Sequence, residues 1–144
     1  MSGTTVRTYS PDRVIVLVGG TPMTAYGEDT FIEIAPAADL STVQVGADGE
    51  IARSISTNKL CTITLTLQQV SPSNNVLSAL MEVDALTGGV LFPLTLQDLR
   101  GTTIFVSSQC WISKRPTITF GREVSDRSWE LMAVPSVWIA GGSL

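Results

Sequence analysis

Apolar residues and threonines alternate strictly along residues 61–67. A cysteine, an isoleucine and two leucines occupy every second position of this segment, and three threonines lie between them. Because successive side chains of a β-strand point to opposite faces of a sheet, this period of two predicts a strand with one apolar face. The opposite face is polar and uncharged, which suits a wet cavity, a lumen or a polar contact. The threonines of that face are Thr62, Thr64 and Thr66.

Six further segments, rich in β-branched residues, have the composition of strands. Turn-forming sequences such as Gly19-Gly20 and Gly88-Gly89 separate them. Many short strands spaced by turns indicate a fold dominated by β-structure, an antiparallel sandwich or barrel. The predicted strands are residues 13–18, 30–35, 90–96, 102–112, 117–120 and 129–134.

One segment departs from this pattern and predicts a helix over residues 73–86. Residues 71–74 supply helix-capping side chains and a proline suited to a first turn. Beyond them, apolar residues recur at the helical period, and Gly88 is placed to end the helix. We therefore expect a single amphipathic helix packed on the sheet. Its apolar stripe is Val76, Leu77, Leu80, Met81 and Val83.

Residues 40–57 contain a strong short signal for a β-hairpin, the dipeptide Asp48-Gly49. A two-residue turn at this dipeptide pairs Val45 with Ala52, and neither face of the resulting hairpin is decisively apolar. Because a two-stranded hairpin alone is marginally stable in water, it should lean on other structure. Two interpretations stay open: the hairpin folds back on its own sheet, or it is an arm that docks on a neighbouring subunit.

The chain carries fewer charges than an ordinary soluble domain. Charged residues make up 15% of the sequence and the mean hydropathy is +0.28, whereas about 25% charged residues is typical. This balance favours assembly, in which other subunits cover part of the surface, although the many Ser and Thr residues are an alternative source of solubility. The net charge of −4 argues against electrostatic wrapping of nucleic acid.

The length of 144 residues predicts a single domain over residues 1–144. Residues 1–11 are expected to form a flexible N-terminal arm. The longest apolar run, residues 14–18, is too short to span a membrane. It also lacks the length and cleavage site of a secretory signal, so neither a membrane anchor nor a signal peptide is predicted.

The sequence offers little chemistry for catalysis. It contains no histidine, which excludes metal sites and general bases that rest on imidazole. Cys61 and Cys110 are predicted to be buried, reduced thiols. We therefore predict no enzyme activity and no catalytic, cofactor or metal site. Trp111, Trp129 and Trp138 leave one ligand-binding alternative open, the sugar-stacking platform of a monomeric β-sandwich module.

An ordered set of features, spread over residues 12–135, resembles the tube proteins of contractile-tailed bacteriophages. The set begins with the Asp-Gly-Glu turn and Ile-Ala-Arg of residues 48–53, followed by the threonine strand that runs into the capped helix. It continues with Phe-Pro-Leu at 92–94 and Asp-Leu-Arg-Gly at 98–101. It ends with Cys-Trp-Ile at 110–112 and Trp-Glu-Leu at 129–131.

This resemblance implies a structural virion protein that assembles with copies of itself. Members of the family are small β-barrel or sandwich domains with one helix, and they form hexameric rings that stack into the inner tube of a contractile tail. The tube conducts the genome during ejection, so DNA is in transit and not bound. The resemblance also implies tail sheath, baseplate and tape-measure proteins as partners, and assembly in the host cytoplasm.

The resemblance further assigns roles to individual residues. The hairpin 40–57 would be a projecting arm that contacts the adjacent ring, and the threonine face of Thr62, Thr64 and Thr66 would line the lumen. The helix would lie on the outside, towards the sheath. The interface residues of the arm would be Val43, Val45, Asp48, Gly49, Ile51, Arg53 and Ile55.

Two other functions remain open from the sequence. One is a related ring protein on the same fold, either a baseplate or tail-terminus protein or the tube of a phage-derived contractile particle. The other is the monomeric carbohydrate-binding module, which would use exposed tryptophans. A chain that forms rings or tubes favours the assembly functions, and a compact monomer favours the module.

Overall fold

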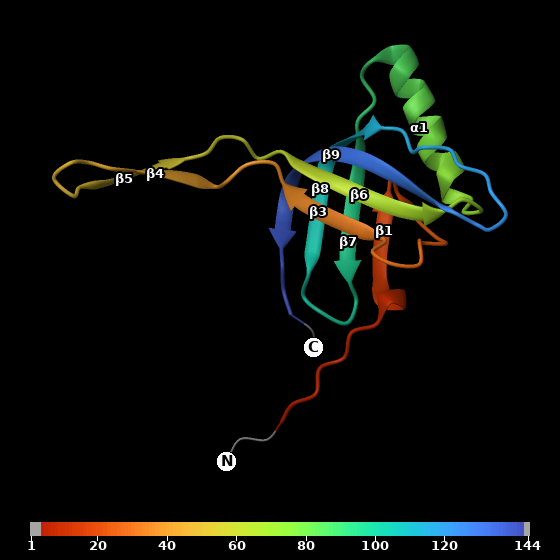
Figure 1. Cartoon of the computed structure of the whole chain (residues 1–144), viewed down its shortest axis with the longest axis horizontal. Coiled ribbons are helices and arrows are strands. Elements are labelled where there is room, and N and C mark those ends of the chain that lie inside the picture. Colours follow the sequence, from red (N-terminus) through yellow and green to blue (C-terminus); the bar gives the residue numbers. More distant parts are fainter. Residues whose placement is uncertain (1–3, 143–144) are drawn as a thin grey trace.

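The computed structural model describes residues 4–142 and contains a seven-stranded antiparallel sheet with a separate two-stranded hairpin (Figure 1). The strand order in the large sheet is β2-β1-β7-β8-β9-β6-β3, and β4 pairs only with β5. The elements are η1 (Pro11–Arg13), β1 (Val14–Val18), β2 (Thr21–Pro22), β3 (Ile32–Pro36), β4 (Ser41–Val45), β5 (Ile51–Ile55), β6 (Cys61–Gln68), α1 (Ser73–Thr87), β7 (Phe92–Asp98), β8 (Ile104–Lys114) and β9 (Asp126–Ile139). The predicted fold class, antiparallel β-structure with one helix and a projecting hairpin, is confirmed.

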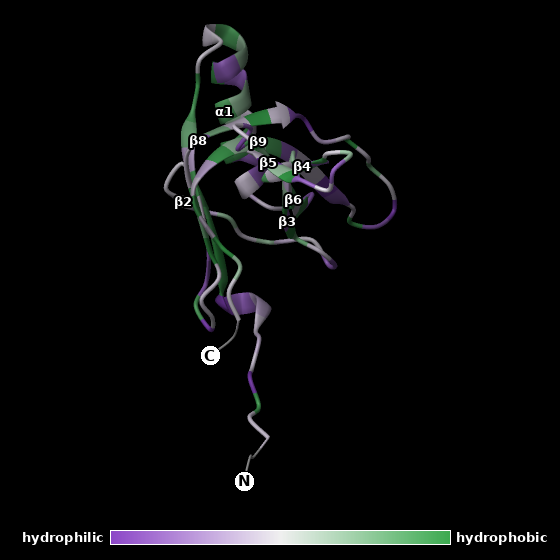
Figure 2. Ribbon diagram, turned by 90° about the vertical axis from the view of Figure 1, so that its left-hand side faces the viewer, coloured by the Kyte–Doolittle hydropathy of each residue, from purple (hydrophilic) through white to green (hydrophobic). Residues whose placement is uncertain are grey.

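The large sheet is bent at the pairing of β8 with β9. The register of this pair shifts at three places, two of which flank Ser107, and bulges of this kind bend a strand pair and increase its twist. Ser107 is fully buried, and its hydroxyl donates to the Val134 carbonyl at 2.7 Å and accepts the Gln109 N–H at 3.2 Å. Figure 2 shows the result: β8 and β2 stand along one side, and β9, β6 and β3 turn away from them.

The core fills the inside of this bend. Strand β6 contributes as its sequence predicts: every second residue from Cys61 to Leu67 is fully buried, and the three threonines between them are not. The other strands that face the bend also present alternate apolar side chains to this interior, and α1 adds Leu77. The largest of these are Val16, Val18, Leu77, Leu94, Phe105 and Leu131.

Helix α1 begins and ends close to the predicted residues, but its first turn is built differently. Asn74 does not cap the helix; its buried side chain donates to the Gln68 carbonyl at 2.9 Å and accepts the indole N–H of Trp129 at 2.9 Å. At the other end Gly88 has φ +70° and donates its N–H to the Asp84 carbonyl, as predicted for a glycine that ends a helix.

The packed stripe of α1 is narrower than predicted. Leu77 is buried, and Val76, Leu80 and Met81 pack against the core. Val83 is exposed, so its assignment to this stripe was wrong. The reason is geometric: α1 packs against β8, and the last turns of the helix extend past the sheet (Figure 1).

Most predicted strands are present, with two differences. Residues 117–120 form no strand, since Pro116 lacks an N–H and no neighbouring strand pairs with this segment within residues 4–142. Strand β9 is longer than its predicted span of 129–134 and continues through Pro135, which sits opposite Ser107 where the register shifts. A bulge is one of the few places in a sheet where a proline is tolerated.

The hairpin is present, but its register differs by one residue from the predicted one. Val45 pairs with Ile51, not with Ala52. Gly49 has φ +90° and donates its N–H to the Gly46 carbonyl at 3.0 Å, and the Gly46 N–H donates to the Glu50 carbonyl at 2.7 Å. This is a three-residue loop with glycine at the left-handed position rather than a two-residue turn.

Of the predicted N-terminal arm, residues 1–3 lie outside the described part of the chain. Residues 4–9 are exposed and have no regular structure, and Pro11–Arg13 form the short 3-10 helix η1. The segment leads away from the sheet in Figure 1. The flexibility expected for residues 1–11 stays a prediction.

Candidate assembly surfaces

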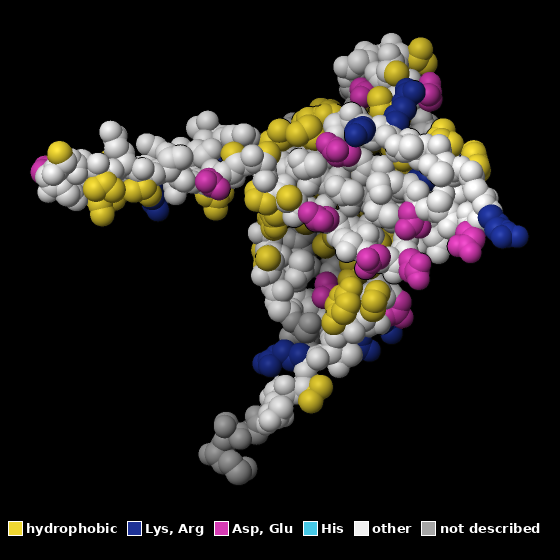
Figure 3. Space-filling view, in the orientation of Figure 1, with side chains coloured by type: hydrophobic (Ala, Val, Ile, Leu, Met, Phe, Trp, Pro, Cys, Tyr) yellow, Lys and Arg dark blue, Asp and Glu magenta, His cyan; other side chains and the backbone are white. Residues whose placement is uncertain are grey.

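The arm formed by β4 and β5 extends away from the body and has one apolar face. A shift of one residue in a strand pair moves every side chain to the other face. The observed register therefore gathers the aliphatic residues of both strands on one side, together with Arg53, which pairs opposite Val43. The four aliphatic side chains are 61 to 70% exposed, and hydrophobic groups follow one edge of the arm in Figure 3. The apolar face consists of Val43, Val45, Ile51 and Ile55.

The two remaining predicted interface residues, Asp48 and Gly49, build the tip of the arm. The Asp48 carboxylate accepts the Glu50 N–H at 3.2 Å, and Gly49 adopts the positive φ that a residue with a side chain resists. Their place in the structure accounts for the Asp-Gly signal without any contact to another subunit. The opposite face of the arm is mostly polar, with Gln44 and Ser54 among its residues.

The threonine face of β6 lies on the outside of the sheet and is flanked by acidic residues. Thr64 is exposed and pairs with Glu33 of β3 on one side and Glu130 of β9 on the other. Thr66 is partly covered by its own chain: a Cβ placed on Gly27 would lie 2.8 Å from the Thr66 methyl group, so only glycine fits there. Thr64 is thus the most open of the three predicted positions, and Thr62 is half-buried.

The large sheet has open strand edges. Strands β2 and β3 each pair on one side only. The last six residues of β9 pair with β8 but extend past the end of β6, whose Cys61 is opposite Ala133. Four large apolar side chains in this overhang are exposed to between 37 and 51%. Open edges carry unpaired backbone groups that pair readily with another chain. The exposed residues are Val134, Val137, Trp138 and Ile139.

Two apolar grooves flank β3. The first, of about 530 Å³, lies at the root of the arm, where Leu40, Leu60 and Trp138 meet beside Asp39 and Lys59. The second lies at the start of β3, between β1 and residues 22–31, and measures about 880 Å³. We call it the β1 groove. The sequence does not predict this groove, because its aromatic residues lie outside any periodic pattern. The one available signal is a pair of aromatic residues in a loop, Tyr26 and Phe31. The apolar residues that line it include Ile15, Leu17, Pro22, Tyr26 and Phe31.

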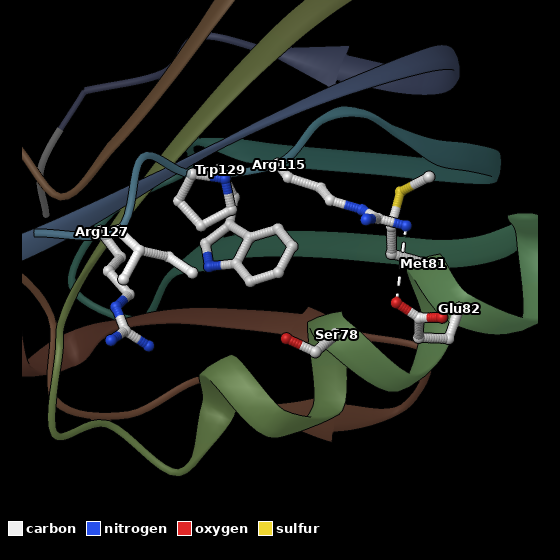
Figure 4. A pocket seen from close by; sticks show the side chains of 8 residues that line it. Ser78, Met81, Glu82, Arg115, Arg127 and Trp129 are labelled. Carbon is white, nitrogen blue, oxygen red and sulfur yellow. Dashed lines mark ion pairs between the residues drawn. The ribbon is translucent and has the colours of Figure 1, made fainter.

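A smaller pocket of about 240 Å³ lies between α1 and the segment after β8 (Figure 4). Glu82 of the helix forms an ion pair with Arg115 at 3.5 Å, and both side chains are more than half exposed. Trp129 forms the floor and is only 3% exposed. Arg127 also lines this pocket, and its guanidinium lies 5.6 Å from the centre of the Phe120 ring. Ion pairs as exposed as Glu82–Arg115 contribute little to stability.

The three tryptophans do not form a platform for a sugar. Trp129 is buried and bonded to Asn74, and Trp138 packs edge-on against Phe105, with ring centroids 5.5 Å apart. Trp111 pairs opposite Met132 on another part of the sheet. The arrangement favours tryptophans as packing residues.

Cys61 and Cys110 are buried free thiols, as predicted. Burial, together with the neighbouring Cys61, raises the pKa of Cys110 to about 12, and burial also raises the pKa of Cys61. Such thiols are poor nucleophiles at neutral pH. Within residues 4–142, no three acidic or cysteine side chains cluster as metal ligands would. None of the helices described there has the length and apolar character needed to cross a membrane.

Three solved structures share the fold. The tube-terminating cap of the anti-feeding prophage has a TM-score of 0.64 and 13% identity, covering 92% of this chain and 91% of that chain. The sheath/tube terminator of an extracellular contractile injection system has a TM-score of 0.62 and 16% identity, and the match covers 90% of this chain and 95% of that chain. A chain of the sheath–tube complex of an extracellular contractile injection system has a TM-score of 0.63 and 14% identity, and the match covers 95% of this chain and 93% of that chain. The fold is thus that of subunits found in tubular contractile assemblies.

The sequence comparison identifies the family. The model of the bacteriophage PhiTE tail tube protein matches residues 8–137, which is most of the chain. The chain therefore belongs to this family of phage tail tube proteins. It is also 27% identical, over 151 aligned residues, to structural protein ORF10 of Pseudomonas phage KPP10, covering 99% of this chain and 87% of that protein. The predicted resemblance is confirmed, and the protein is a structural component of a phage tail tube.

Proposed function

We propose that this tail tube protein forms hexameric rings that stack into the inner tube of a contractile tail and conduct DNA during ejection. One observation carries the proposal: the arm exposes four aliphatic side chains on a single face, far from its own core. An apolar face of this kind on a two-stranded hairpin is unfavourable in water and marks a contact with another chain.

Ring closure is supported by the open edges of the sheet. Pairing an edge strand of one subunit with an edge strand of the next satisfies backbone groups and removes an aggregation hazard. The β9 overhang and the short edge strand β2 offer such edges. The exposed apolar residues of the overhang are Val134, Val137, Trp138 and Ile139. A ring built in this way buries apolar surface, which matters because the chain has few charged residues to keep it soluble as a monomer.

The threonine face suits the lumen of this tube. Thr64 and its neighbours Glu33 and Glu130 present hydroxyl and carboxylate groups on one side of the sheet. DNA is held by lysine and arginine contacts to phosphate. Two basic residues, Lys114 and Arg115, line the same hollow as Thr64, but Glu130 pairs opposite Lys114 and Glu33 lies on the other side of Thr64, so the carboxylates of this face offset its basic groups. A calculated lumen potential of the assembled tube should be neutral to negative, and a strongly positive one contradicts the assignment.

The helix α1 suits the outer surface of the tube, where sheath proteins are the proposed partners. Its exposed side includes Val83 and Leu86, and two of the similar solved structures are a sheath–tube complex and a sheath/tube terminator. Baseplate and tape-measure proteins are the further partners we propose at the ends and inside the tube, with assembly in the host cytoplasm.

A second candidate function is that of a ring which terminates a tube. The solved structures with this fold include a tube-terminating cap and a sheath/tube terminator. The two functions differ in whether rings continue to stack. A terminator presents one competent ring face, whereas a tube subunit grows into particles of many rings.

Size-exclusion chromatography combined with negative-stain electron microscopy of the purified chain tests both candidates. Rings and long tubes are the expected result for a tube subunit, and isolated rings or pairs of rings are the expected result for a terminator. A monomer of 15.3 kDa that persists at high concentration contradicts both.

A further inference from the structure

We propose that the β1 groove of one subunit is the receptor for the apolar face of the arm from a second copy. The inference rests on the proposed function, because it names the partner surface of the stacking arm. It assigns residues 22–31, which neither the sequence nor the family match singles out, to the contact between copies.

The groove and the arm match in character and size. The groove is lined by apolar and aromatic side chains, of which Ile15 and Leu17 point outward from β1 while Val16 and Val18 point into the core. The lining residues of β1 run from Val14 to Leu17, three residue steps or about 10 Å, and Pro11 and Asp12 continue the lining beyond that strand. The apolar face of β5, from Ile51 to Ile55, spans four steps or about 13 Å. One strand of the arm therefore fits along the groove.

The charges are complementary. Arg53 is the single charged residue on the apolar face of the arm. The residues that line the groove include three carboxylates and no lysine or arginine. Arg13 and Arg100 lie near Asp12, so Glu28 and Asp29 are the carboxylates most available to a partner. In Figure 3, hydrophobic side chains bordered by acidic ones lie just above the point where the N-terminal segment leaves the body. When the aliphatic residues of the arm lie in the groove, Arg53 would reach the carboxylates at its edge and form charge-assisted hydrogen bonds with them. The carboxylates are Asp12, Glu28 and Asp29.

The position of the groove favours it over the groove at the root of the arm. The root groove lies beside the arm itself, so two copies that dock there can do so reciprocally and close into a pair. The β1 groove lies at the start of β3 and the arm at its end, on opposite sides of the body in Figure 1. A contact between two different surfaces is head-to-tail and repeats without limit, as the stacking of a tube requires.

Mixed cysteine cross-linking tests the assignment directly. Ile51→Cys on the arm and Pro22→Cys in the groove are made in separate chains, which are mixed, assembled and oxidised. The native thiols are buried and remain unreactive. We expect a covalent dimer only when both variants are present. A dimer from Ile51→Cys alone, or a stronger one with Lys59→Cys at the root groove, overturns the assignment. Gln44→Cys, on the opposite face of the arm, is the matched control and should cross-link weakly with Pro22→Cys.

A charge exchange provides the second test. Arg53→Glu should raise the protein concentration needed for assembly about tenfold, because it opposes like charges at the border of the groove. Combining it with Glu28→Arg should restore assembly to within a few-fold of the unmodified chain, whereas Arg122→Glu, in the exposed segment before β9, should have little effect.

The two tests separate this inference from the proposed function. If tubes form but the charge exchange restores nothing and cross-links avoid Pro22, the arm docks elsewhere, and the groove assignment fails while the tube function stands. If the unmodified chain forms no rings or tubes at all, both are overturned.

Discussion

Strand β6 and the arm use the same alternation of side chains for opposite purposes. In β6 the apolar residues at alternate positions are completely buried within their own chain. In β4 and β5 the apolar residues also share one face, yet each is more than 60% exposed. Folding buries the first surface, whereas we propose that contact with a second copy buries the other one. A subunit can therefore fold by itself and still expose an apolar surface that favours association.

We predict the largest loss of stability for a substitution in the buried face of β6. Leu65→Ala removes a fully buried side chain from the middle of the core and leaves a cavity. We expect a loss of about 3 kcal/mol in the free energy of unfolding. Chemical denaturation of the unassembled subunit measures this, with Ile51→Ala on the arm as the control, for which we expect a change below about 0.5 kcal/mol. Equal losses for the two variants would show that the arm belongs to the folded core.

For the arm, we predict that a substitution on its apolar face prevents assembly and leaves the subunit folded. Ile51→Asp places a charge in the surface that we propose is covered by a neighbouring copy, and should weaken that contact by about 2 kcal/mol or more. Sedimentation and electron microscopy should show short or absent tubes, while circular dichroism remains that of the folded chain. Gln44→Asp adds the same charge on the opposite face of the arm and should assemble nearly normally. Normal tube growth by Ile51→Asp would contradict the stacking role of the arm.

The same two regions show how far sequence reasoning reaches. The strand at 61–67 was predicted correctly because burial imposes a strict period of two on it. The arm was found but its register was not, because Asp48-Gly49 is compatible with both a two-residue and a three-residue loop. The choice depends on the hydrogen bonds between Gly46 and Glu50, which no local pattern specifies. One residue of register then decides whether the arm has an apolar face.

The candidate surfaces divide in a similar way. The alternation of β6 predicted that Thr64 is exposed, but not that Gly27 covers Thr66, since that contact joins segments far apart in the sequence. The β1 groove was missed for the same reason. Its aromatic pair, Tyr26 and Phe31, has ring centroids 4.6 Å apart, and a bridge between Tyr26 and Leu67 joins this segment to β6. Packing between distant segments creates these features, and local periodicity does not contain them.

A milder way to disturb the arm is to alter its tip. Gly49→Val places a β-branched residue at φ +90°, which such residues rarely adopt. We expect a local cost of about 1–2 kcal/mol that the body of the subunit does not feel, because the arm contacts the large sheet little. Amide hydrogen exchange should speed up in residues 41–55 and stay unchanged in β6. Gly121→Val, at a glycine without positive φ and with open space around it, serves as the control.

We expect the smallest change in stability from a substitution on helix α1, outside both β6 and the arm. Glu82→Gln removes the ion pair with Arg115, whose two side chains are more than half exposed. Because water screens such a pair and its ordering costs side-chain entropy, we expect a change below about 0.5 kcal/mol in the free energy of unfolding. Chemical denaturation at low and high salt should give nearly the same free energy of unfolding for the variant and the unmodified chain. A loss comparable with that of Leu65→Ala would mean that α1 is held to the sheet by charge rather than by Leu77 and its apolar neighbours.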